Sequence, residues 1–233
     1  MLSKRLNAIA QRIPAGSRPL EVGCDHGRLA CALAASGRYP RVIASDVSAP
    51  SLDKCRRLAE RMHLGDRLEL RLGDGLAVVQ PGEVDTVILA GMGGQLMIRL
   101  LEAGKGVLGA VERLLLAPNR DQQALRVVLR GRGWRLEDET LIQEEGRFYP
   151  ILAYVPGRDP LDLGPAPEVG PLMATRATPE LAAFLRMRMD EARLLRADLA
   201  ARDTEPARRM ENALGKKLEQ WEALYENLYG TRA

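Results

Sequence analysis

The chain has 233 residues, of which 46% are hydrophobic and 28% charged, so its composition is that of a folded globular protein and excludes a disordered or fibrous one. That length accommodates one large domain and a smaller one. The net charge is only +3, but residues 1–61 hold eleven Lys or Arg against five Asp or Glu. Such a segment is either an ordinary solvated surface or a face that attracts a polyanion such as nucleic acid.

The three cysteines, Cys24, Cys31 and Cys55, form neither a CxxC pair nor a spacing typical of metal ligands, and their odd number argues against a secreted disulfide framework. No apolar run approaches the ~20 residues that span a bilayer. We therefore expect a cytoplasmic protein with no membrane segment and no metal ion. We also expect a monomer.

The predicted elements alternate between strands and helices. Residues 2–12 form an amphipathic pattern that Pro14 and Gly16 end. Short apolar runs that predict strands then occur at 20–23, 41–45, 68–72, 86–90 and 113–117. Helical patterns lie between them near 28–35, 50–62, 95–103 and 122–131. This order predicts an α/β fold, a parallel sheet with helices on both faces.

The pattern changes after Gly133. Residues 134–142 and 147–155 predict two strands joined by a polar turn at 143–146. A parallel sheet that ends in an antiparallel hairpin differs from the plain dinucleotide-binding fold. It resembles the Rossmann-like, seven-stranded sheet of class I methyltransferases.

Prolines and glycines between 156 and 179 predict a linker, and we expect domains at 1–158 and 178–233 joined by residues 159–177. Thr178, Pro179 and Glu180 supply an N-cap, a first-turn proline and a first-turn acid for a helix through about Ala201. A second helix runs from near Pro206 to Tyr229. The apolar stripes predict an antiparallel, coiled-coil hairpin with the seam Leu181, Leu185, Ala192, Leu195 and Leu199 against Leu214, Leu218, Trp221, Tyr225 and Leu228. Alternatively, the stripe packs on the main domain.

The first predicted strand runs into a glycine loop, Gly23-Cys24-Asp25-His26-Gly27. Glycines and a following helix N-terminus allow a ligand to approach the backbone, although a tight structural turn has the same composition. Asp25 stands where a dinucleotide fingerprint has glycine. Its charge would repel a pyrophosphate but could pair with the amino group of S-adenosylmethionine. His26 either contacts the ligand or caps the turn.

The next strand ends carry further ligand-type loops. Asp46 closes the second strand, 23 residues after Gly23, and is a candidate for both ribose hydroxyls unless it caps the next helix. Gly73-Asp74-Gly75 follows the third strand and can place an acid beside an adenine amino group, although Asp-Gly is also a common turn. Gly91-Met92-Gly93-Gly94 follows the fourth strand, at the edge where ligands bind in open α/β sheets. Together these loops predict one cofactor site.

Pro118-Asn119 follows the fifth strand. This order is similar to the loop with which many amino-methylating enzymes hold a base, but Asn119 could equally cap the helix that starts near Asp121. Local sequence slightly favours the cap.

Taken together, several segments resemble the bacterial tRNA (adenine-22-N1)-methyltransferase family. They are Leu2-Ser3-Lys4-Arg5-Leu6, Ile13-Pro14, the loop at 23–26, Gly73-Asp74-Gly75, Ala90-Gly91-Met92-Gly93-Gly94, Pro118-Asn119 and the C-terminal helical pair. The resemblance implies methyl transfer from S-adenosylmethionine to nitrogen 1 of an adenosine in tRNA. It assigns cofactor contact to Gly23, Asp25, Asp46, Asp74 and residues 91–93. Asp46 departs from the glutamate common in the family, but both are carboxylates.

Nitrogen 1 attacks without prior proton removal, so positioning matters most. We expect Asn119, the carbonyl before it, or Asp25 to accept from the exocyclic amino group of the target base. Lys4, Arg5, Arg12 and Arg28 are expected to contact phosphate, and the helical hairpin a distant part of the tRNA. Three other functions remain open: an NAD-dependent oxidoreductase, a catalytically silent RNA-binding module, and a methyltransferase for another RNA site.

Overall fold

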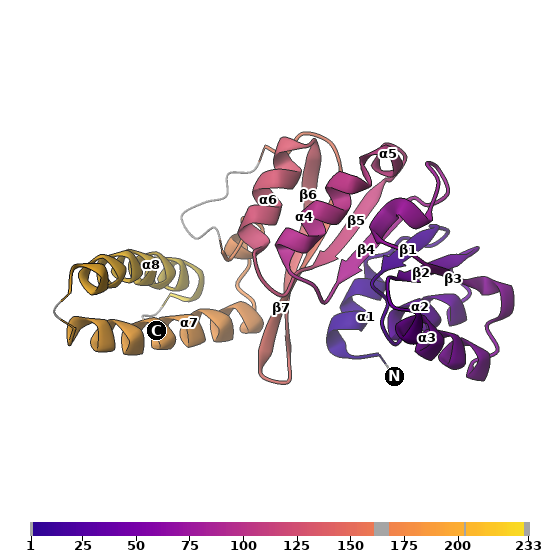
Figure 1. Cartoon of the computed structure of the whole chain (residues 1–233). Helices are drawn as coiled ribbons and strands as arrows, with labels where there is room; N and C mark the ends of the chain where they lie inside the picture. Colours follow the sequence, from indigo (N-terminus) through magenta and orange to yellow (C-terminus); the bar gives the residue numbers. More distant parts are fainter. Residues whose placement is uncertain (1, 161–167, 203, 231–233) are drawn as a thin grey trace. The chain divides into compact units, whose positions relative to one another are not determined.

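The computed structural model describes residues 2–160, 168–202 and 204–230. The chain divides into two compact units, Met1–Pro160 and Leu161–Ala233. The first unit contains a sheet with helices, and the second contains two long helices (Figure 1). A sheet followed by a helical pair is the fold that the sequence predicts.

The first unit is built on a seven-stranded sheet in the order β3-β2-β1-β4-β5-β7-β6. Its strands are β1 (Pro19–Val22), β2 (Val42–Asp46), β3 (Leu68–Leu72), β4 (Thr86–Ala90), β5 (Arg113–Ala117), β6 (Trp134–Glu144) and β7 (Arg147–Pro156). Strands β1 to β5 are parallel, whereas β7 is antiparallel to both neighbours, which confirms the predicted terminal hairpin. Strand order reverses between β1 and β4, and ligands bind beyond the carboxyl ends of strands at such a point.

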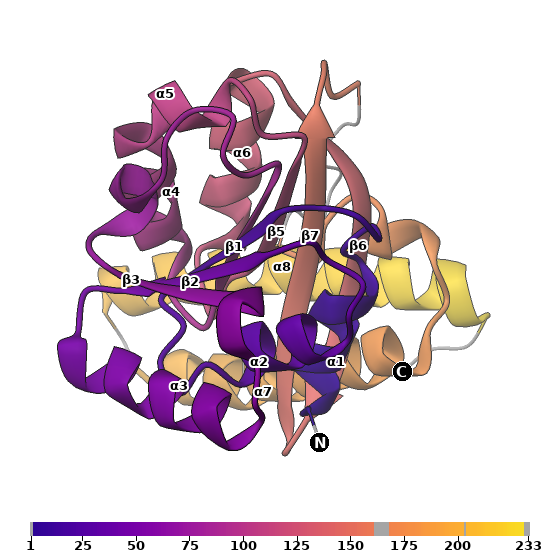
Figure 2. The same ribbon diagram turned by 90° about the vertical axis from the view of Figure 1, so that its right-hand side faces the viewer.

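Helices cover both faces of the sheet (Figure 2), with α1 to α3 on one face and α4 to α6 on the other. Their bounds are α1 (Lys4–Gln11), α2 (Arg28–Ala35), α3 (Ala49–Arg61), α4 (Gly94–Ala103), α5 (Lys105–Leu108) and α6 (Gln122–Gly131). All residues of β1, and all but the last of β2 and β4, are buried. Strands covered on both faces read as continuous apolar runs, which explains the pattern in the sequence.

The β6–β7 hairpin is longer than predicted. Its ladder continues to the pair Glu144–Arg147, so the turn is Glu145-Gly146 and not residues 143–146. Glu145 and Gly146 have φ values of +49° and +74°. Two successive left-handed residues form the turn whose twist matches that of paired strands, and the ladder can therefore reach the tip.

Helix α1 begins at Lys4 and not at Leu2. The Ser3 hydroxyl accepts a hydrogen bond from the Leu6 amide at 3.4 Å and so caps the helix one residue earlier. Helix α5 was not predicted, and neither were the single 3₁₀ turns η1 (Gly65–Arg67) and η2 (Gly75–Val78). One turn is too short to produce a readable hydrophobic period.

In the second unit, α7 (Pro179–Ala200) and α8 (Glu205–Tyr229) pack against each other. The Thr178 hydroxyl caps α7 by accepting from the Leu181 amide at 3.2 Å, as predicted. Tyr229 donates to the Thr178 carbonyl at 2.7 Å, so the end of α8 lies beside the start of α7. The helices are thus antiparallel. The predicted linker contains the 3₁₀ turn η3 (Met173–Thr175).

One residue of the predicted seam is wrong. Leu195 is 45% exposed, while Met189, which was not predicted, is fully buried. Arg196 occupies the layer assigned to Leu195, with its guanidinium 3.3 Å from the position of a Cβ on Gly215, and it pairs with Glu211 at 2.6 Å. The missing side chain of Gly215 makes room for the arginine, and the helix rotation that brings Arg196 inward turns Leu195 outward.

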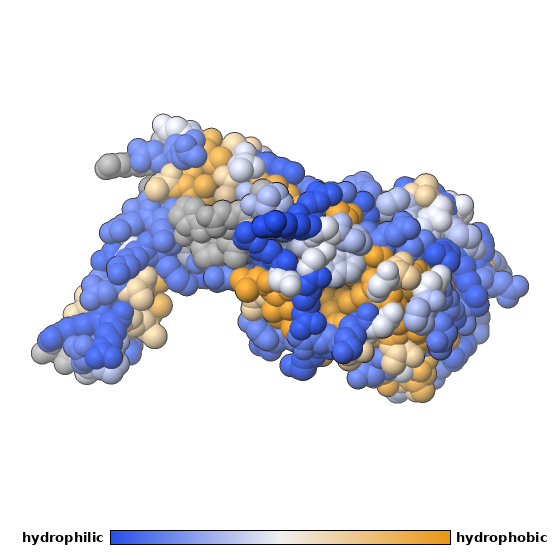
Figure 3. All heavy atoms as spheres, turned by 90° about the horizontal axis from the view of Figure 1, so that it is seen from above, coloured by the Kyte–Doolittle hydropathy of each residue, from blue (hydrophilic) through white to orange (hydrophobic). Residues whose placement is uncertain are grey.

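The surface seen from above in Figure 3 has hydrophobic patches separated by hydrophilic residues. Within the described part of the chain, none of the helices combines the length and hydropathy needed to cross a bilayer. A mixed surface of this kind is ordinary for globular proteins.

Candidate cofactor and base-binding site

The loop between β1 and α2 is tied to the end of β2. The amides of Gly23 and Cys24 both donate to the Ser45 carbonyl, at 2.8 and 3.0 Å. Asp25 has a φ of +47°, in the left-handed region that aspartate tolerates better than most residues. Its side chain is 67% exposed. Asp25 therefore takes the backbone conformation of a loop glycine while presenting a negative charge.

Asp46 joins this loop to the start of α3. One carboxylate oxygen accepts from the Asp25 amide at 3.0 Å and the other from the Ser48 amide at 2.9 Å. Ser48, and not Asp46, caps α3, because its hydroxyl accepts from the Ser51 amide at 3.3 Å. Each carboxylate oxygen has a second acceptor position, so a half-buried Asp46 can still bind hydroxyl groups.

The end of β3 completes this side of the edge. The Gly73 amide donates to the Asp46 carbonyl at 3.1 Å, and Asp74 precedes η2 without a capping bond from its side chain. Val47, directly after β2, is 68% exposed, and Leu72, the last residue of β3, is 61% exposed. These two apolar side chains were not predicted as site residues, although the sequence shows them at strand ends. They lie beside Asp46, because Val47 follows it in the chain and Leu72 is its register partner on β3, and they offer apolar surface suited to a planar ring.

The loops after β4 and β5 are bonded together. The Gly91 amide donates to the Ala117 carbonyl at 3.2 Å and the Asn119 amide to the Met92 carbonyl at 2.9 Å. The Asn119 side-chain NH₂ also donates to the Gly91 carbonyl, at 2.8 Å. That bond points the amide nitrogen inward and leaves the side-chain oxygen as an acceptor. Asn119 is exposed and does not cap α6, whose N-cap is Asp121.

Close backbone packing requires the glycines at this point. A Cβ on Gly94 would lie 2.6 Å from the Asp121 carbonyl oxygen. A Cβ on Gly23 would lie 3.1 Å from the Met92 methyl group, which brings Met92 over the first loop. The first and fourth strand ends are therefore in contact, as the predicted single site requires.

Arg5 and Tyr149 lie beside the glycine turn. The Arg5 guanidinium is stacked 4.7 Å from the centre of the Tyr149 ring, and its Nη1 is 4.0 Å from the position of a Cβ on Gly91. The Nε of Arg5 is buried without a hydrogen-bond partner among the described residues. Arg5, a predicted phosphate contact, therefore lies at the carboxyl edge of the sheet. Tyr149 was not predicted, because only the pairing of β7 with β5 brings it there.

The other predicted RNA contacts differ in their surroundings. Lys4 is exposed on α1, and Arg28 is exposed at the start of α2. Arg12 is bonded to Asp138 at 2.9 Å and to the Ala8 carbonyl at 2.9 Å, so its guanidinium is already engaged. His26 is 45% exposed, with Nδ1 3.7 Å from a carboxylate oxygen of the adjacent aspartate.

A buried carboxyl group links β1 to α2, the two elements that the first loop connects. Glu21 is 6% exposed and accepts from the Ala30 amide of α2 at 2.8 Å. Burial raises the pKa of Glu21 to about 8, partly opposed by this hydrogen bond. Glu21 is therefore largely protonated at neutral pH. Its negatively charged form would lie under a loop that already carries carboxylates.

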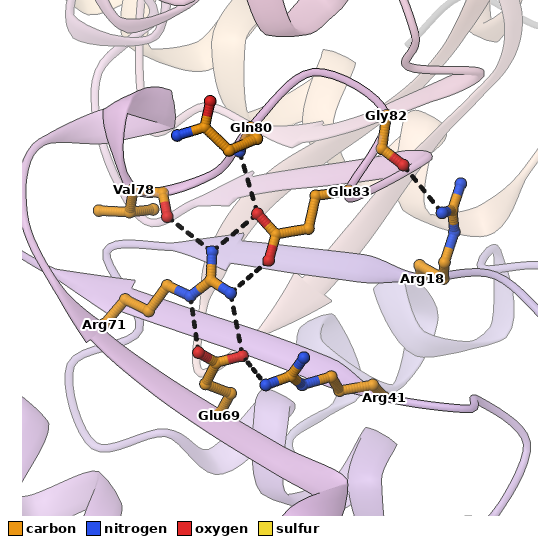
Figure 4. A network of polar contacts seen from close by, with 8 residues as sticks. All are labelled: Arg18, Arg41, Glu69, Arg71, Val78, Gln80, Gly82 and Glu83. Carbon is orange, nitrogen blue, oxygen red and sulfur yellow. Dashed lines mark hydrogen bonds and ion pairs between the residues drawn. The ribbon is translucent and has the colours of Figure 1, made fainter.

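An ion-pair network holds the loop after β3 (Figure 4). Arg71 of β3 donates to the Val78 carbonyl at 2.7 Å and to Glu83 at 2.9 Å, and it pairs with Glu69 at 2.9 Å. Glu69 also pairs with Arg41. The Arg71 guanidinium and the Gln80 amide lower the pKa of Glu83 to about 2. The network fixes the course of residues 75–83, which begin directly after Asp74.

The residues at this edge fit S-adenosylmethionine. That molecule carries positive charge and hydrogen-bond donors at its amino group, ribose and adenine. The edge offers the carboxylates of Asp25, Asp46 and Asp74 with two exposed apolar side chains. Carboxylates pair with such groups and repel a pyrophosphate. Among the described residues there is no group of three His, Cys, Asp or Glu that could hold a metal ion, and the three cysteines are buried free thiols.

Comparison with known proteins assigns the family. Residues 2–152 match the family described as "Methyltransferase domain". The tRNA (adenine(22)-N(1))-methyltransferase of Bacillus subtilis is 35% identical over 178 residues, which cover 74% of this chain and 75% of the relative.

Solved structures agree with this assignment. The crystal structure of the B. subtilis m1A22 tRNA methyltransferase has a TM-score of 0.85 at 29% identity, covering 97% of this chain and 99% of that one. Streptococcus pneumoniae Sp1610, solved in complex with S-adenosyl-L-methionine, has a TM-score of 0.85 at 30% identity, covering 97% of this chain and all of the other. The chain belongs to the family of bacterial tRNA (adenine-22-N1)-methyltransferases.

Proposed function

We propose that this protein methylates nitrogen 1 of adenosine 22 in tRNA, with S-adenosylmethionine as the methyl donor. The observation that carries the proposal is the convergence of Asp25, Asp46, Asp74, the Gly91 turn and Asn119 at one edge of the sheet, in a chain of this family. An NAD-dependent reaction is disfavoured, because the carboxylates oppose a pyrophosphate.

In this proposal, the carboxylates bind the cofactor. Asp46 accepts from the ribose hydroxyls through the acceptor positions that the loop amides leave open. Asp25, together with Gly23 and His26, faces the amino-acid end. Asp74 with Gly73 and Gly75 faces the adenine amino group. The backbone of Gly91, Met92 and Gly93 closes the site from the β4 side.

Bound S-adenosylmethionine supplies an electrophilic methyl group on a sulfonium. Nitrogen 1 of adenine has an in-plane lone pair, so the protein needs no general base and its task is to align the base. The Asn119 oxygen, whose amide partner is held by the Gly91 carbonyl, accepts from the exocyclic amino group of the target adenine. This bond stabilises the positive charge that develops on the ring. The base must be splayed out of the folded tRNA to reach the site.

The remaining assignments concern tRNA contact. We infer that residues 1–158 carry the catalytic domain, that 159–177 connect the domains, and that 178–233 grip a distant part of the tRNA. The phosphate contacts that we propose in the first unit are Lys4, Arg5, Arg12 and Arg28. Arg5 can also face the target nucleotide, because it lies against Gly91.

Methyl transfer from labelled S-adenosylmethionine to an unmodified tRNA transcript tests the proposed function. The expected product blocks reverse transcription at position 22, and a transcript with guanosine at position 22 accepts no label. Label in another nucleotide would point to a different RNA site. Absence of transfer, with tRNA binding retained, would support the silent RNA-binding module.

Asn119→Ala tests the base contact. We expect kcat to fall by about 10²-fold, the effect of removing one such hydrogen bond in a transition state. Cofactor affinity measured by calorimetry serves as the control, because loss of the Gly91 contact alone would loosen the cofactor turn. Wild-type turnover in Asn119→Ala with unchanged cofactor affinity would refute the assignment.

Asp25→Asn tests the charge at the first loop. Asparagine tolerates the left-handed conformation equally well, so only the charge is lost. We expect cofactor affinity to fall about tenfold, in keeping with the loss of one charge-assisted hydrogen bond. Equal affinity in Asp25→Asn and wild type would show that the carboxylate does not bind the amino group.

A further inference from the structure

An open groove of about 700 Å³ is lined by residues of α2 and α3. These two helices lie on the face of the sheet opposite α4 to α6 (Figure 2). The cationic lining residues of the groove are Arg28 from α2 and Lys54, Arg57 and Arg61 from α3. All of its lining residues are described, and they include no Asp or Glu. The groove is thus a concave surface of one charge sign, a shape that concentrates the field on an anion.

The three cations of α3 form a row. They are spaced at i, i+3 and i+7, which puts them on one side of a helix. Seven residues of helix span about 10 Å. Successive phosphates of one strand of a DNA duplex advance ~3.4 Å along the axis, so the row has the length of a few phosphates.

The side chains of these four cations have no ion pair or hydrogen bond to any residue that the structure describes. Elsewhere in the same unit, ion pairs hold the guanidinium groups of Arg12, Arg18, Arg41, Arg56, Arg71, Arg113, Arg126 and Arg132. Like charges three and four residues apart destabilise a helix. Arg99 and Arg130 also lack an ion pair with the described residues, so a missing pair alone does not mark a site. Four unpaired cations that line one groove with no acidic lining residue form a surface suited to an anionic partner.

The position of the groove identifies the partner. His26 lines the groove and belongs to the same loop as Asp25 and Gly23. The anion site therefore borders the candidate methyl-transfer site. A nucleic acid that presents a base at the carboxyl edge must continue past it on both sides, and its flanking phosphates then meet this loop.

We propose that the α2–α3 groove binds the phosphodiester backbone of the tRNA substrate beside the target adenosine, through Arg28, Lys54, Arg57 and Arg61. This inference rests on the proposed function. It adds three α3 residues to the contacts that the sequence predicts. It also explains the basic excess in residues 1–61, which includes all four cations.

The test compares two triple variants of the full chain. Lys54→Ala/Arg57→Ala/Arg61→Ala removes three cations from the groove. Arg99→Ala/Lys105→Ala/Arg130→Ala removes three exposed cations from α4, α5 and α6, on the other face of the sheet. The two variants have equal net charge, so a general electrostatic effect would weaken both to the same extent.

The affinity for tRNA is measured by fluorescence anisotropy at several KCl concentrations. We expect the groove variant to bind at least tenfold more weakly at low salt, and its slope of log K against log[KCl] to be shallower by about 2 to 3, because each lost phosphate contact lowers the slope by about 0.7–0.9. The control variant should match the wild type in slope. Calorimetry with S-adenosylmethionine checks that the groove variant has folded.

Equal slopes for the two variants would overturn the inference. Tight binding of inorganic phosphate to the groove, with an unchanged tRNA slope, would overturn it too, in favour of a site for a free phosphate group. The binding assay does not depend on catalysis. If the wild type transfers no methyl group but the groove variant still has a shallower salt slope than the wild type, the proposed reaction is refuted and the RNA groove is supported.

Discussion

Replacing Glu21 with glutamine should abolish much of the pH dependence of the stability of the first unit. Glu21 lies at the end of β1, two residues before Gly23, and its carboxyl group is buried against the Ala30 amide. Burial raises its pKa from 4.5 to about 8. Between these two values the folded protein keeps a proton that the unfolded chain has lost. The contribution of Glu21 to stability is therefore fully present below pH 4.5 and is lost as pH rises through 8.

The magnitude follows from the size of the shift, because one pKa unit corresponds to ~1.36 kcal/mol of unfolding free energy. Over pH 5 to 8 the loss amounts to roughly 3–4 kcal/mol, a large share of the ~5–15 kcal/mol typical of a domain. Glutamine has the same shape and accepts the Ala30 hydrogen bond without titrating.

Urea unfolding of the full-length wild type and Glu21→Gln, followed by circular dichroism from pH 5 to 8.5, measures the difference. The two proteins should be closest at the acid end, and the variant should be the more stable above pH 7. All other titratable groups are the same in both proteins, so their contributions cancel in the comparison. Parallel curves for the two proteins would refute the idea that Glu21 is protonated in the folded state.

Three further predictions concern stability. Arg126 and Glu139 form an ion pair whose side chains are 2% and 0% exposed, so Arg126→Ala should cost about 3–5 kcal/mol in urea unfolding, while the paired change Arg126→Met/Glu139→Leu should restore most of it. A Cβ on Gly94 would lie 2.6 Å from a backbone carbonyl oxygen, so Gly94→Ala should destabilise the protein by about 1–3 kcal/mol and weaken cofactor binding. Gly106→Ala is the control and should have neither effect, because a Cβ there has no atom within 4 Å. The pKa of Glu83 is lowered to about 2, so its contribution is present above pH 4.5 and lost as pH falls toward 2; thermal melting of Glu83→Gln should show a flatter acid limb, and an unchanged limb would contradict the network.

Several elements of the fold were predictable because their signals are local. The bounds of β3, β4, β5 and α2 are the predicted ones. Strands β4 and β5 are mostly buried and form apolar runs, β3 alternates apolar with charged residues, and α2 begins after a glycine loop. Thr178 was identified as a cap for the same reason. Leu195 was assigned wrongly, because the rotation of α7 depends on the room that Gly215 leaves for Arg196 on the other helix.

The candidate site shows the same division. Asp25, Asp46, Asp74 and Asn119 were readable, since each follows a predicted strand and parallel strands end at one edge. Their hydrogen bonds were not readable. The bond from the Asn119 side chain to the Gly91 carbonyl leaves the Asn119 oxygen free to accept. It joins residues 28 positions apart, so the sequence around either residue does not predict it.

By itself, the sequence determined the order of strands and helices, the loops at the strand ends and the basic character of the first 61 residues. Only the tertiary structure decided which cations pair with carboxylates and which line a groove, and that Arg5 and Tyr149 meet beside the glycine turn. The physical reason is the range of the forces involved. Turns, caps and hydrophobic periods depend on neighbours along the chain, whereas ion pairs, burial and pKa values depend on neighbours in space.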